Sequence, residues 1–421
     1  MGKRNYITYF TLSNGSFRYM ASDSDEIGTY VTIPDNIKHK YTMFKGYDAT
    51  DEGLILFTKD FERWNNELKT NPICKLDYTF YFTHHIAVEA IFKKYSSEQD
   101  NHLTAKKWIV EPVTVIEESY MSKCFNGGLT YCEEYEGPCY GYDYNSFYPR
   151  MLANDTFEIP TQQGIEKYTD VKYHMKNNTL QYGMYYVEIK SSNPNAKKIF
   201  GFSKHDVYTH YSIKFAYKHR VEYGFKFGFW SEEDGYNSFV YEDEDEDMLN
   251  CKPGSYFFGT WLNRLTSMRK LYPKNKLLKH LLSSLWDSLC RKRTIMKTSD
   301  QIIKEELDVN CDNTGDYEII EHYFKDNGKD YYKLRDCNAP YHYGLARLKP
   351  FLVARGRNKI ASLAMKNINS VKRIHTDNVT FTQPVNISKI ENLEAEDKTT
   401  GNLKWEKVNR QPIRITSSCE T

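Results

Sequence analysis

The sequence predicts an α+β protein, and three observations support this fold class. Apolar and aromatic residues with strand-like patterning occupy residues 139–149. Two leucine-containing stretches, 258–272 and 275–293, repeat their apolar residues at helical spacing. Residues 370–384 hold two short strand-like runs around a polar tip, which is typical of a β-hairpin. With 421 residues the chain is too long for one simple core, so we expect two or three compact units.

The first 110 residues mix strand-like runs with polar turns. The runs are 5–12, 53–57 and 78–82. Residues 84–95 have instead the spacing of a short amphipathic helix. We find no clean pattern of metal-binding acids in this part, and the nearest candidate, the acidic stretch 23–26, is better interpreted as a solvated turn.

The character of the chain changes at Phe258. Residues 151–257 are polar and strand-rich, and the acidic run 241–248 predicts a solvated loop. The two helical stretches that follow are separated by Pro273, which cannot continue a helix. A third helix is expected over 349–367, with a proline near its start.

Composition excludes several classes of protein. The formal net charge is +1, so a polyanionic partner is not indicated by global charge. Nine cysteines are scattered without a CxxC pair, which argues against a thiolate zinc site. An odd number of cysteines without a signal peptide favours reduced thiols and an intracellular protein. No apolar run approaches the roughly 18 residues that a membrane span needs, so we expect no membrane partner.

Two acids and a lysine form the constellation that carries chemistry. Asp143 stands at a predicted strand end, and Asp377 stands at the predicted hairpin tip. If the two carboxylates face each other across a sheet, they repel unless cations neutralise them. Mg²⁺ prefers such hard oxygen ligands and bridges carboxylates to substrate phosphates. Because Lys279 on a neighbouring helix would reach those phosphates, the pattern suits two-metal phosphoryl or nucleotidyl transfer.

Three motifs in this order resemble those of family-B DNA polymerases, especially the protein-primed branch of phages, linear plasmids and eukaryotic viruses. Residues 143–149 match the first motif, Asp-x-x-Ser-Leu-Tyr-Pro, with Phe147 in place of leucine. The second motif is Lys-x-x-x-Asn-Ser-x-Tyr-Gly, and its counterpart here keeps Lys279, Ser284 and an aromatic residue, Trp286. The third is Tyr-x-Asp-Thr-Asp-Ser, of which Thr376 and the second aspartate, Asp377, are present.

Two further segments resemble the same family. Residues 125–128 are similar to its Tyr-x-Gly-Gly segment near the template strand, which implies a DNA-binding role for Phe125, Gly127 and Gly128. Residues 401–406 are weakly similar to the lysine-containing segment near the primer end, which places Lys404 there. The resemblance covers roughly residues 115–410.

The resemblance implies a role for each matched residue. Asp143 and Asp377 would bind two Mg²⁺ ions, for which Mn²⁺ would substitute, and the Tyr144 carbonyl would complete a metal shell. Tyr148 would pack under the sugar and exclude a 2′-hydroxyl, and Lys279 would neutralise charge on the triphosphate. The remaining positions implied to contact nucleotide or DNA are Asn145, Ser146, Phe147, Arg269, Lys276, Ser284, Trp286 and Thr376. Taken singly, Asp143 remains open to interpretation as a turn acid and Lys279 as an ordinary solvated lysine.

Three departures from the family pattern bear on activity. His375 stands where the third motif has its first aspartate. Asp287 and Ser283 replace the glycine and asparagine of the second motif, and a carboxylate there repels a triphosphate unless it pairs with Arg291. The short N-terminal part implies no proofreading, and the short stretch after Asp377 implies a minimal thumb with a weak grip on duplex DNA.

The resemblance divides the chain into four parts. These are a reduced, exonuclease-like remnant (1–110), a first palm part with a strand-rich insertion (111–257), fingers helices (258–297) and a second palm part with a minimal thumb (298–421). The basic residues Arg347, Lys349, Arg355, Arg357 and Lys359 are interpreted as a phosphate-tracking face or a solvated helix face.

The expected activity is template-directed synthesis from deoxynucleoside triphosphates on a DNA template and primer, in the replication of a virus or mobile element. Priming by a terminal protein and binding of another replication factor stay open. One alternative is a degenerate polymerase that binds nucleic acid or a replication partner without turnover, which the three departures favour. A two-metal nuclease on another fold is a second alternative, but it leaves the Lys279 helix unexplained.

Overall fold

The computed structural model describes most of the chain. The described residues are 6–11, 17–22, 30–33, 51–72, 74–78, 84–96, 110–124, 127–144, 146–241, 251–272, 276–310, 315–324, 330–385 and 403–415. They form two compact units, of which the first comprises residues 1–107, 152–157 and 253–289, and the second comprises 108–151, 158–252 and 290–421. Among the described residues no helix is long and apolar enough to cross a membrane.

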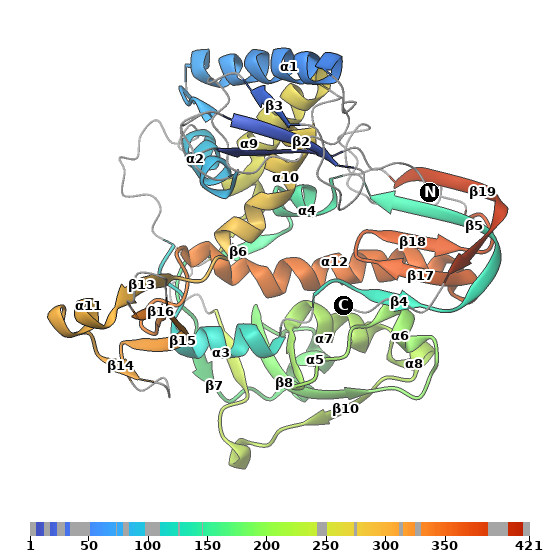
Figure 1. Ribbon diagram of the computed structural model, residues 1–421. Helices are drawn as coiled ribbons and strands as arrows, with labels where there is room; N and C mark the ends of the chain where they lie inside the picture. The colour runs from blue at the N-terminus through green and yellow to red at the C-terminus, as the bar shows by residue number, and fades with distance from the viewer. Residues whose placement is uncertain are drawn as a thin grey trace. The chain divides into compact units, whose positions relative to one another are not determined.

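The first unit combines an antiparallel three-stranded sheet with helices (Figure 1). Its elements are β1 (Tyr6–Thr11), β2 (Phe17–Ser22), β3 (Tyr30–Ile33), α1 (Asp51–Thr70), α2 (His84–Ser96), α9 (Gly254–Leu271) and α10 (Lys276–Leu289). Helix α2 packs against both α9 and α10. In this core the ring of Phe92 stacks on Phe258 at 5.1 Å and meets Trp261 edge-on at 6.1 Å.

Most sequence-based predictions for this unit are confirmed, and one is wrong. The strand at 5–12 and the helices at 84–95, 258–272 and 275–293 are present. The apolar run 53–57 is not a strand but the beginning of α1, whose Trp64 and Leu68 are fully buried one helical turn apart. Pro273 and most of the run 78–82 lie outside the described residues.

A five-stranded antiparallel sheet organises the second unit. Its strand order is β19-β5-β18-β17-β4. The strands are β4 (Thr130–Cys132), β5 (Tyr135–Tyr144), β17 (Val371–His375), β18 (Asn378–Phe381) and β19 (Leu403–Ile415). Strands β17 and β18 are the predicted hairpin, and β19 adds a long strand beside β5 that the sequence analysis did not predict.

Helix α12 (Leu348–Ala364) packs beside this sheet and contacts β18 (Figure 1). Pro350 lies in its first turn, where the missing N–H costs no hydrogen bond, so the predicted third helix is confirmed. Other short helices of this unit are α3 (Val115–Cys124), η4 (Gly344–Arg347) and η5 (Met365–Ser370). Helix α4 (Phe147–Leu152) follows directly after β5.

The polar region between the first and second motifs contains helices as well as strands. Five strands of this region form a separate sheet. Its order is β10-β8-β11-β7, and β9 also pairs with β8. The elements are β6 (Glu158–Pro160), β7 (Ile165–Lys167), α5 (Val171–Asn177), β8 (Gly183–Lys190), α6 (Ala196–Ile199), β9 (Val207–Thr209), α7 (His210–Lys218), α8 (Arg220–Tyr223), β10 (Lys226–Phe229), η3 (Glu232–Asp234), β11 (Ser238–Val240) and β12 (Cys251–Pro253). The acidic run lies outside the described residues from position 242 onwards.

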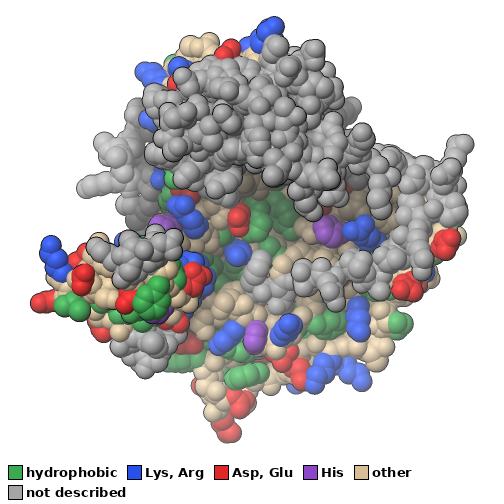
Figure 2. Space-filling model, viewed as in Figure 1, with side chains coloured by type: hydrophobic (Ala, Val, Ile, Leu, Met, Phe, Trp, Pro, Cys, Tyr) green, Lys and Arg blue, Asp and Glu red, His purple; other side chains and the backbone are tan. Residues whose placement is uncertain are grey.

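The charged segment after α10 folds into a further small sheet. Its strands are β13 (Thr294–Thr298), β14 (Val309–Asn310), β15 (Tyr317–Phe324) and β16 (Asp330–Asp336), and helix α11 (Ser299–Lys304) packs on β13 and β16. Large apolar side chains, including Phe324 at 73% exposure, lie on its surface (Figure 2).

The five basic residues between Arg347 and Lys359 do not form one exposed face, so that interpretation is wrong. Arg347 is fully buried, and its guanidinium pairs with Glu117 at 2.9 Å. Arg357 is 7% exposed and donates from Nε to the Gly127 carbonyl at 2.8 Å. These two cations hold the chain together internally and are not available to track a phosphate backbone.

Candidate active site

Asp143, the first acid of the site, stands near the end of β5, and the buried side chains of the residues on either side of it anchor the strand. Tyr142 and Tyr144 are buried on either side of Asp143, as the alternation of a strand requires. The Tyr142 hydroxyl accepts from the Val385 N–H at 2.8 Å and lies 3.1 Å from the Val385 carbonyl. Asp143 is itself only half-buried, so its carboxylate stands at the edge of a well-packed layer.

The second acid stands at the tip of the β17–β18 hairpin. Thr376 adopts a left-handed conformation with φ of +57°, which makes the two-residue turn with Asp377. The Asp377 N–H donates to the His375 carbonyl at 2.7 Å, and the Thr376 N–H donates to the Leu129 carbonyl at 3.0 Å. These bonds fix the backbone at the tip, so the position of Asp377 is set by the hairpin and by the segment before β4.

The sheet register makes the two acids neighbours. Asp143 on β5 lies opposite Asn378 on β18, the residue directly after Asp377. The Tyr144 N–H donates to the Asp377 carbonyl at 3.0 Å. Residues separated by more than two hundred positions therefore lie one residue apart across two hydrogen-bonded strands. His375, at the position that departs from the family pattern, is exposed at the end of β17 and pairs with Asn378 and Thr130.

Tyr148 lies beside Asp377 and is held against α12. Burial, and then the negative charge of Asp377, raise the pKa of Tyr148 to about 12, so the phenol stays neutral. Its ring meets Phe147 edge-on at 5.1 Å. A methyl group at Gly356 would lie 3.2 Å from both rings, which shows how closely α12 approaches them.

The Gly-Gly segment before β4 touches both the hairpin tip and α12. Gly127 has a φ of +69°, which favours glycine, and its carbonyl accepts the Arg357 bond. A methyl group at Gly128 would lie 3.0 Å from the Thr376 side chain. The segment therefore supports the tip that carries Asp377. Phe125 lies outside the described residues.

The turn after Asp143 has the local geometry of a strand-to-helix junction. Ser146 has a φ of +53°, and its carbonyl accepts from the Arg150 N–H at 3.0 Å in the first turn of α4. The Lys359 ammonium lies 5.5 Å from the centre of the Tyr144 ring. Asn145 lies outside the described residues. Arg357 and Lys359 contact the site from α12, far along the chain from Gly127 and Tyr144. No sequence pattern connects these positions, so their contacts with the site could not be predicted.

The last strand places another predicted residue beside the site. Lys404 on β19 lies opposite Asp143 on β5, on the side away from β18. The segment 401–406, which weakly resembles a primer-end segment, therefore places the Lys404 backbone next to Asp143.

The predicted fingers residues lie in the first unit. Helix α10 buries Leu278, Leu281, Leu282, Leu285 and Leu289. Lys279 and Asp287 are exposed on the same helix, and Trp286 is half-buried. The Ser284 hydroxyl donates to the His280 carbonyl at 2.5 Å. Helix α10 begins at Lys276. On α9, burial lowers the pKa of the half-buried Arg269 guanidinium. Whether these groups face the carboxylates stays a prediction.

The donor set at the sheet edge suits a hard divalent cation. Two carboxylates and the Tyr144 backbone carbonyl are oxygen ligands, which Mg²⁺ prefers. Among the described residues no group of three or more histidine, cysteine or acidic side chains could hold a metal alone. Mg²⁺ is commonly held by one or two carboxylates together with substrate phosphates.

Comparison with solved structures identifies the fold. Phi29 DNA polymerase bound to primer-template DNA and incoming nucleotide matches with a TM-score of 0.51 at 13% identity, covering 93% of this chain and 68% of that one. The same polymerase bound to single-stranded DNA matches at 0.52 and 11% identity, covering 96% and 73%. Its post-translocation binary complex with primer-template DNA matches at 0.53 and 12% identity, covering 93% and 67%.

The chain has the fold of a DNA polymerase. The similarity to the fold of Phi29 DNA polymerase extends over most of the chain. No family model matches the sequence, and no curated protein matches it.

Proposed function

We propose that the protein is a DNA-directed DNA polymerase that adds deoxynucleotides to a primer 3′-hydroxyl by two-metal nucleotidyl transfer. The observation that carries this proposal is the register of β5 against β18, which makes Asp143 and Asp377 neighbours at one edge of the sheet. The polymerase fold and the DNA-bound state of the similar structures support DNA and nucleotides as partners.

In this proposal Asp143, Asp377 and the Tyr144 carbonyl hold two Mg²⁺ ions, for which Mn²⁺ substitutes. The ions supply activation of the attacking hydroxyl and charge stabilisation at the α-phosphate. The residues themselves orient the reactants: the hairpin turn fixes Asp377, and the packed Tyr148 ring presents a flat surface to the sugar. Lys279 neutralises the triphosphate from the fingers helix.

The finer parts of the proposal rest on the sequence. The lack of an acidic pattern in residues 1–110 supports synthesis without proofreading, and the protein-primed resemblance supports initiation on a protein hydroxyl during replication of a virus or mobile element. Thr376 and the Gly127–Gly128 segment would contact the template strand beside the tip that they support.

Template-directed primer extension tests the proposal. The wild-type protein should extend a labelled primer in Mg²⁺ according to the template, and Asp143→Asn and Asp377→Asn should each reduce the rate at least about a thousandfold. Asp300→Asn, which removes an exposed acid on α11, should leave extension unchanged. DNA binding without extension by the wild type would identify instead a polymerase fold that acts only in binding. DNA degradation that requires both acids but no nucleotides would identify a nuclease.

A further inference from the structure

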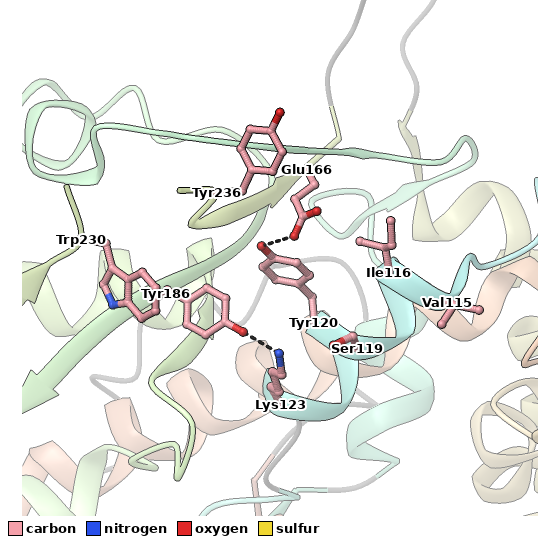
Figure 3. Close-up of a pocket in the computed structure, with 9 residues that line it drawn as sticks. All are labelled: Val115, Ile116, Ser119, Tyr120, Lys123, Glu166, Tyr186, Trp230 and Tyr236. Carbon is pink, nitrogen blue, oxygen red and sulfur yellow. Dashed lines mark hydrogen bonds between the residues drawn. The ribbon is translucent and has the colours of Figure 1, made fainter. Parts of the chain in front are cut away.

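A second site candidate is an aromatic pocket in the second unit, apart from the acids. The pocket has a volume of about 370 Å³. It lies between α3, β7, β8 and the loop after β10, and Figure 3 shows Tyr186 beside Trp230 and Tyr120 beside Glu166. The residues that matter here are Tyr120, Lys123, Glu166, Tyr186, Trp230 and Tyr236.

Aromatic rings form the walls of the pocket. Tyr186 and Trp230 lie with ring centres 4.8 Å apart and 32° between their planes. Tyr120 meets Tyr186 edge-on at 5.5 Å. Trp230 is 40% exposed and Tyr236 is 62% exposed, so large aromatic faces are left in contact with water. Such rings offer flat, electron-rich surfaces on which a cation can stack.

The polar groups of the pocket are arranged with one acid directed inward. Glu166 accepts a hydrogen bond from the Tyr120 hydroxyl at 2.9 Å, which orients the carboxylate and leaves it further acceptor positions (Figure 3). The Lys123 ammonium instead donates to the Tyr186 hydroxyl at 2.6 Å. The lysine therefore serves to position a wall ring.

The rim adds negative charge. Glu232, Glu233 and Asp234 form η3, which lies in the chain between the pocket residues Trp230 and Tyr236. All three acids are exposed. The lining residues themselves carry one acid, Glu166, and one lysine, Lys123, and the three acids of η3 stand between two lining residues in the chain. Acids gathered in this way disfavour a phosphate backbone and favour a cation.

We propose that this pocket binds an arginine side chain presented by a protein partner. A guanidinium is planar and weakly hydrated, so it stacks on Tyr186 or Trp230 while its N–H groups pair with the Glu166 carboxylate. The compact, strongly hydrated ammonium of lysine uses aromatic walls less well. The proposal does not depend on DNA synthesis, because none of the pocket residues belongs to the acid pair or its supports.

Calorimetric titration with a blocked tetra-arginine peptide tests the proposal on the full chain. The peptide should bind, and a tetra-lysine peptide should bind at least about threefold more weakly. Titrated separately, a tetra-glutamate peptide should not bind, and any binding of a single-stranded oligothymidine should be unchanged by Trp230→Ala. Trp230→Ala and Glu166→Gln should each weaken tetra-arginine binding about fivefold to thirtyfold. The matched controls Tyr173→Ala and Asp300→Asn remove an exposed aromatic and an exposed acid elsewhere, and both should bind normally.

Three results would overturn the proposal. The first is that Asp300→Asn weakens tetra-arginine binding as much as Glu166→Gln does, which would show that the peptide binds by general charge attraction. The second is tetra-arginine binding that neither pocket variant changes. The third is oligothymidine binding that Trp230→Ala abolishes, which would make the pocket a base-stacking surface. Unfolding temperatures of all variants are measured alongside, and Tyr236→Ala replaces Trp230→Ala if that variant is unstable.

Discussion

At the scale of single residues, the proposed chemistry depends on Asp143, Asp377 and the residues that position them. Asp143 and Asp377 are positioned by the backbone hydrogen bonds of the sheet and the hairpin and by buried neighbours. Tyr148 stays neutral over the physiological pH range because burial and Asp377 raise its pKa. The role of each group can therefore be tested by a substitution that leaves the sheet intact.

Lys279→Ala should reduce kcat/KM for nucleotide incorporation about 100-fold to 1,000-fold, because a cation that stabilises the transition state is lost. Lys279→Arg should recover part of the loss. Single-nucleotide incorporation kinetics measure both, and Lys176→Ala on α5, another exposed lysine, serves as the control. Unchanged kcat/KM in Lys279→Ala would remove the fingers lysine from the mechanism.

Tyr148→Val should lower the preference for deoxynucleotides over ribonucleotides at least about tenfold, because a smaller side chain leaves room for a 2′-hydroxyl. Competing incorporation of the two nucleotides on one template measures the preference directly. A variant that is slower with both nucleotides but equally selective would show that the ring supports the site without contacting the sugar.

At the scale of elements, a buried ion pair joins α3 to the start of α12. Arg347 pairs with Glu117, and its guanidinium also donates to the Glu111 and Gln162 carbonyls at 3.0 and 2.6 Å. The Tyr241 hydroxyl donates to the same carboxylate at 2.7 Å. Burial raises the pKa of Glu117, and Arg347 opposes that rise.

Arg347→Met should destabilise the fold by about 3–5 kcal/mol, because it leaves a buried carboxylate without its cation. Without Arg347 the folded-state pKa of Glu117 rises further above its unfolded value. Stability from this group is therefore present at low pH and lost as pH rises through the folded pKa, so the defect should be smaller at pH 5 than at pH 8.

Chemical denaturation at both pH values measures the effect, and Arg293→Met is the matched control. Arg293 is half-exposed and 3.4 Å from Asp336, so its loss should cost less than about 1 kcal/mol. A defect in Arg347→Met that is as small as the control's would contradict the structural role.

The same two elements show what the sequence could and could not predict. The neighbouring backbone positions of Asp143 and Asp377 could be expected because each acid lies in a short motif that resembles the family's and because the hairpin pattern was clear. The burial of Arg347 was not, because its partner Glu117 lies 230 residues away and a basic side chain gives no sign of pairing. The run 53–57 was assigned to a strand because five apolar residues are too few to distinguish a strand from a helix.

At the scale of the whole molecule, the formal net charge of +1 limits how strongly DNA is attracted. Figure 2 shows both signs of charge intermixed on the described surface of the second unit. Arg347 and Arg357 are buried and occupied internally, so they add nothing to contacts with the phosphate backbone. Binding to a primer-template duplex should therefore rest on a small number of phosphate contacts.

We expect the logarithm of duplex affinity to fall against the logarithm of salt concentration with a slope of about −3 to −5. Fluorescence anisotropy titrations between about 50 and 300 mM salt measure this slope. A slope of about −8 or steeper would reveal an extensive basic surface, and no salt dependence would argue against backbone binding altogether.

The most direct test of the central claim is a crystal structure with Mn²⁺, primer-template DNA and an unreactive nucleotide, with manganese located by anomalous scattering. The account predicts Mn²⁺ within about 2.0–2.3 Å of carboxylate oxygens of both Asp143 and Asp377, and bound to the nucleotide phosphates. Manganese absent from these carboxylates, or held by other residues, would contradict it.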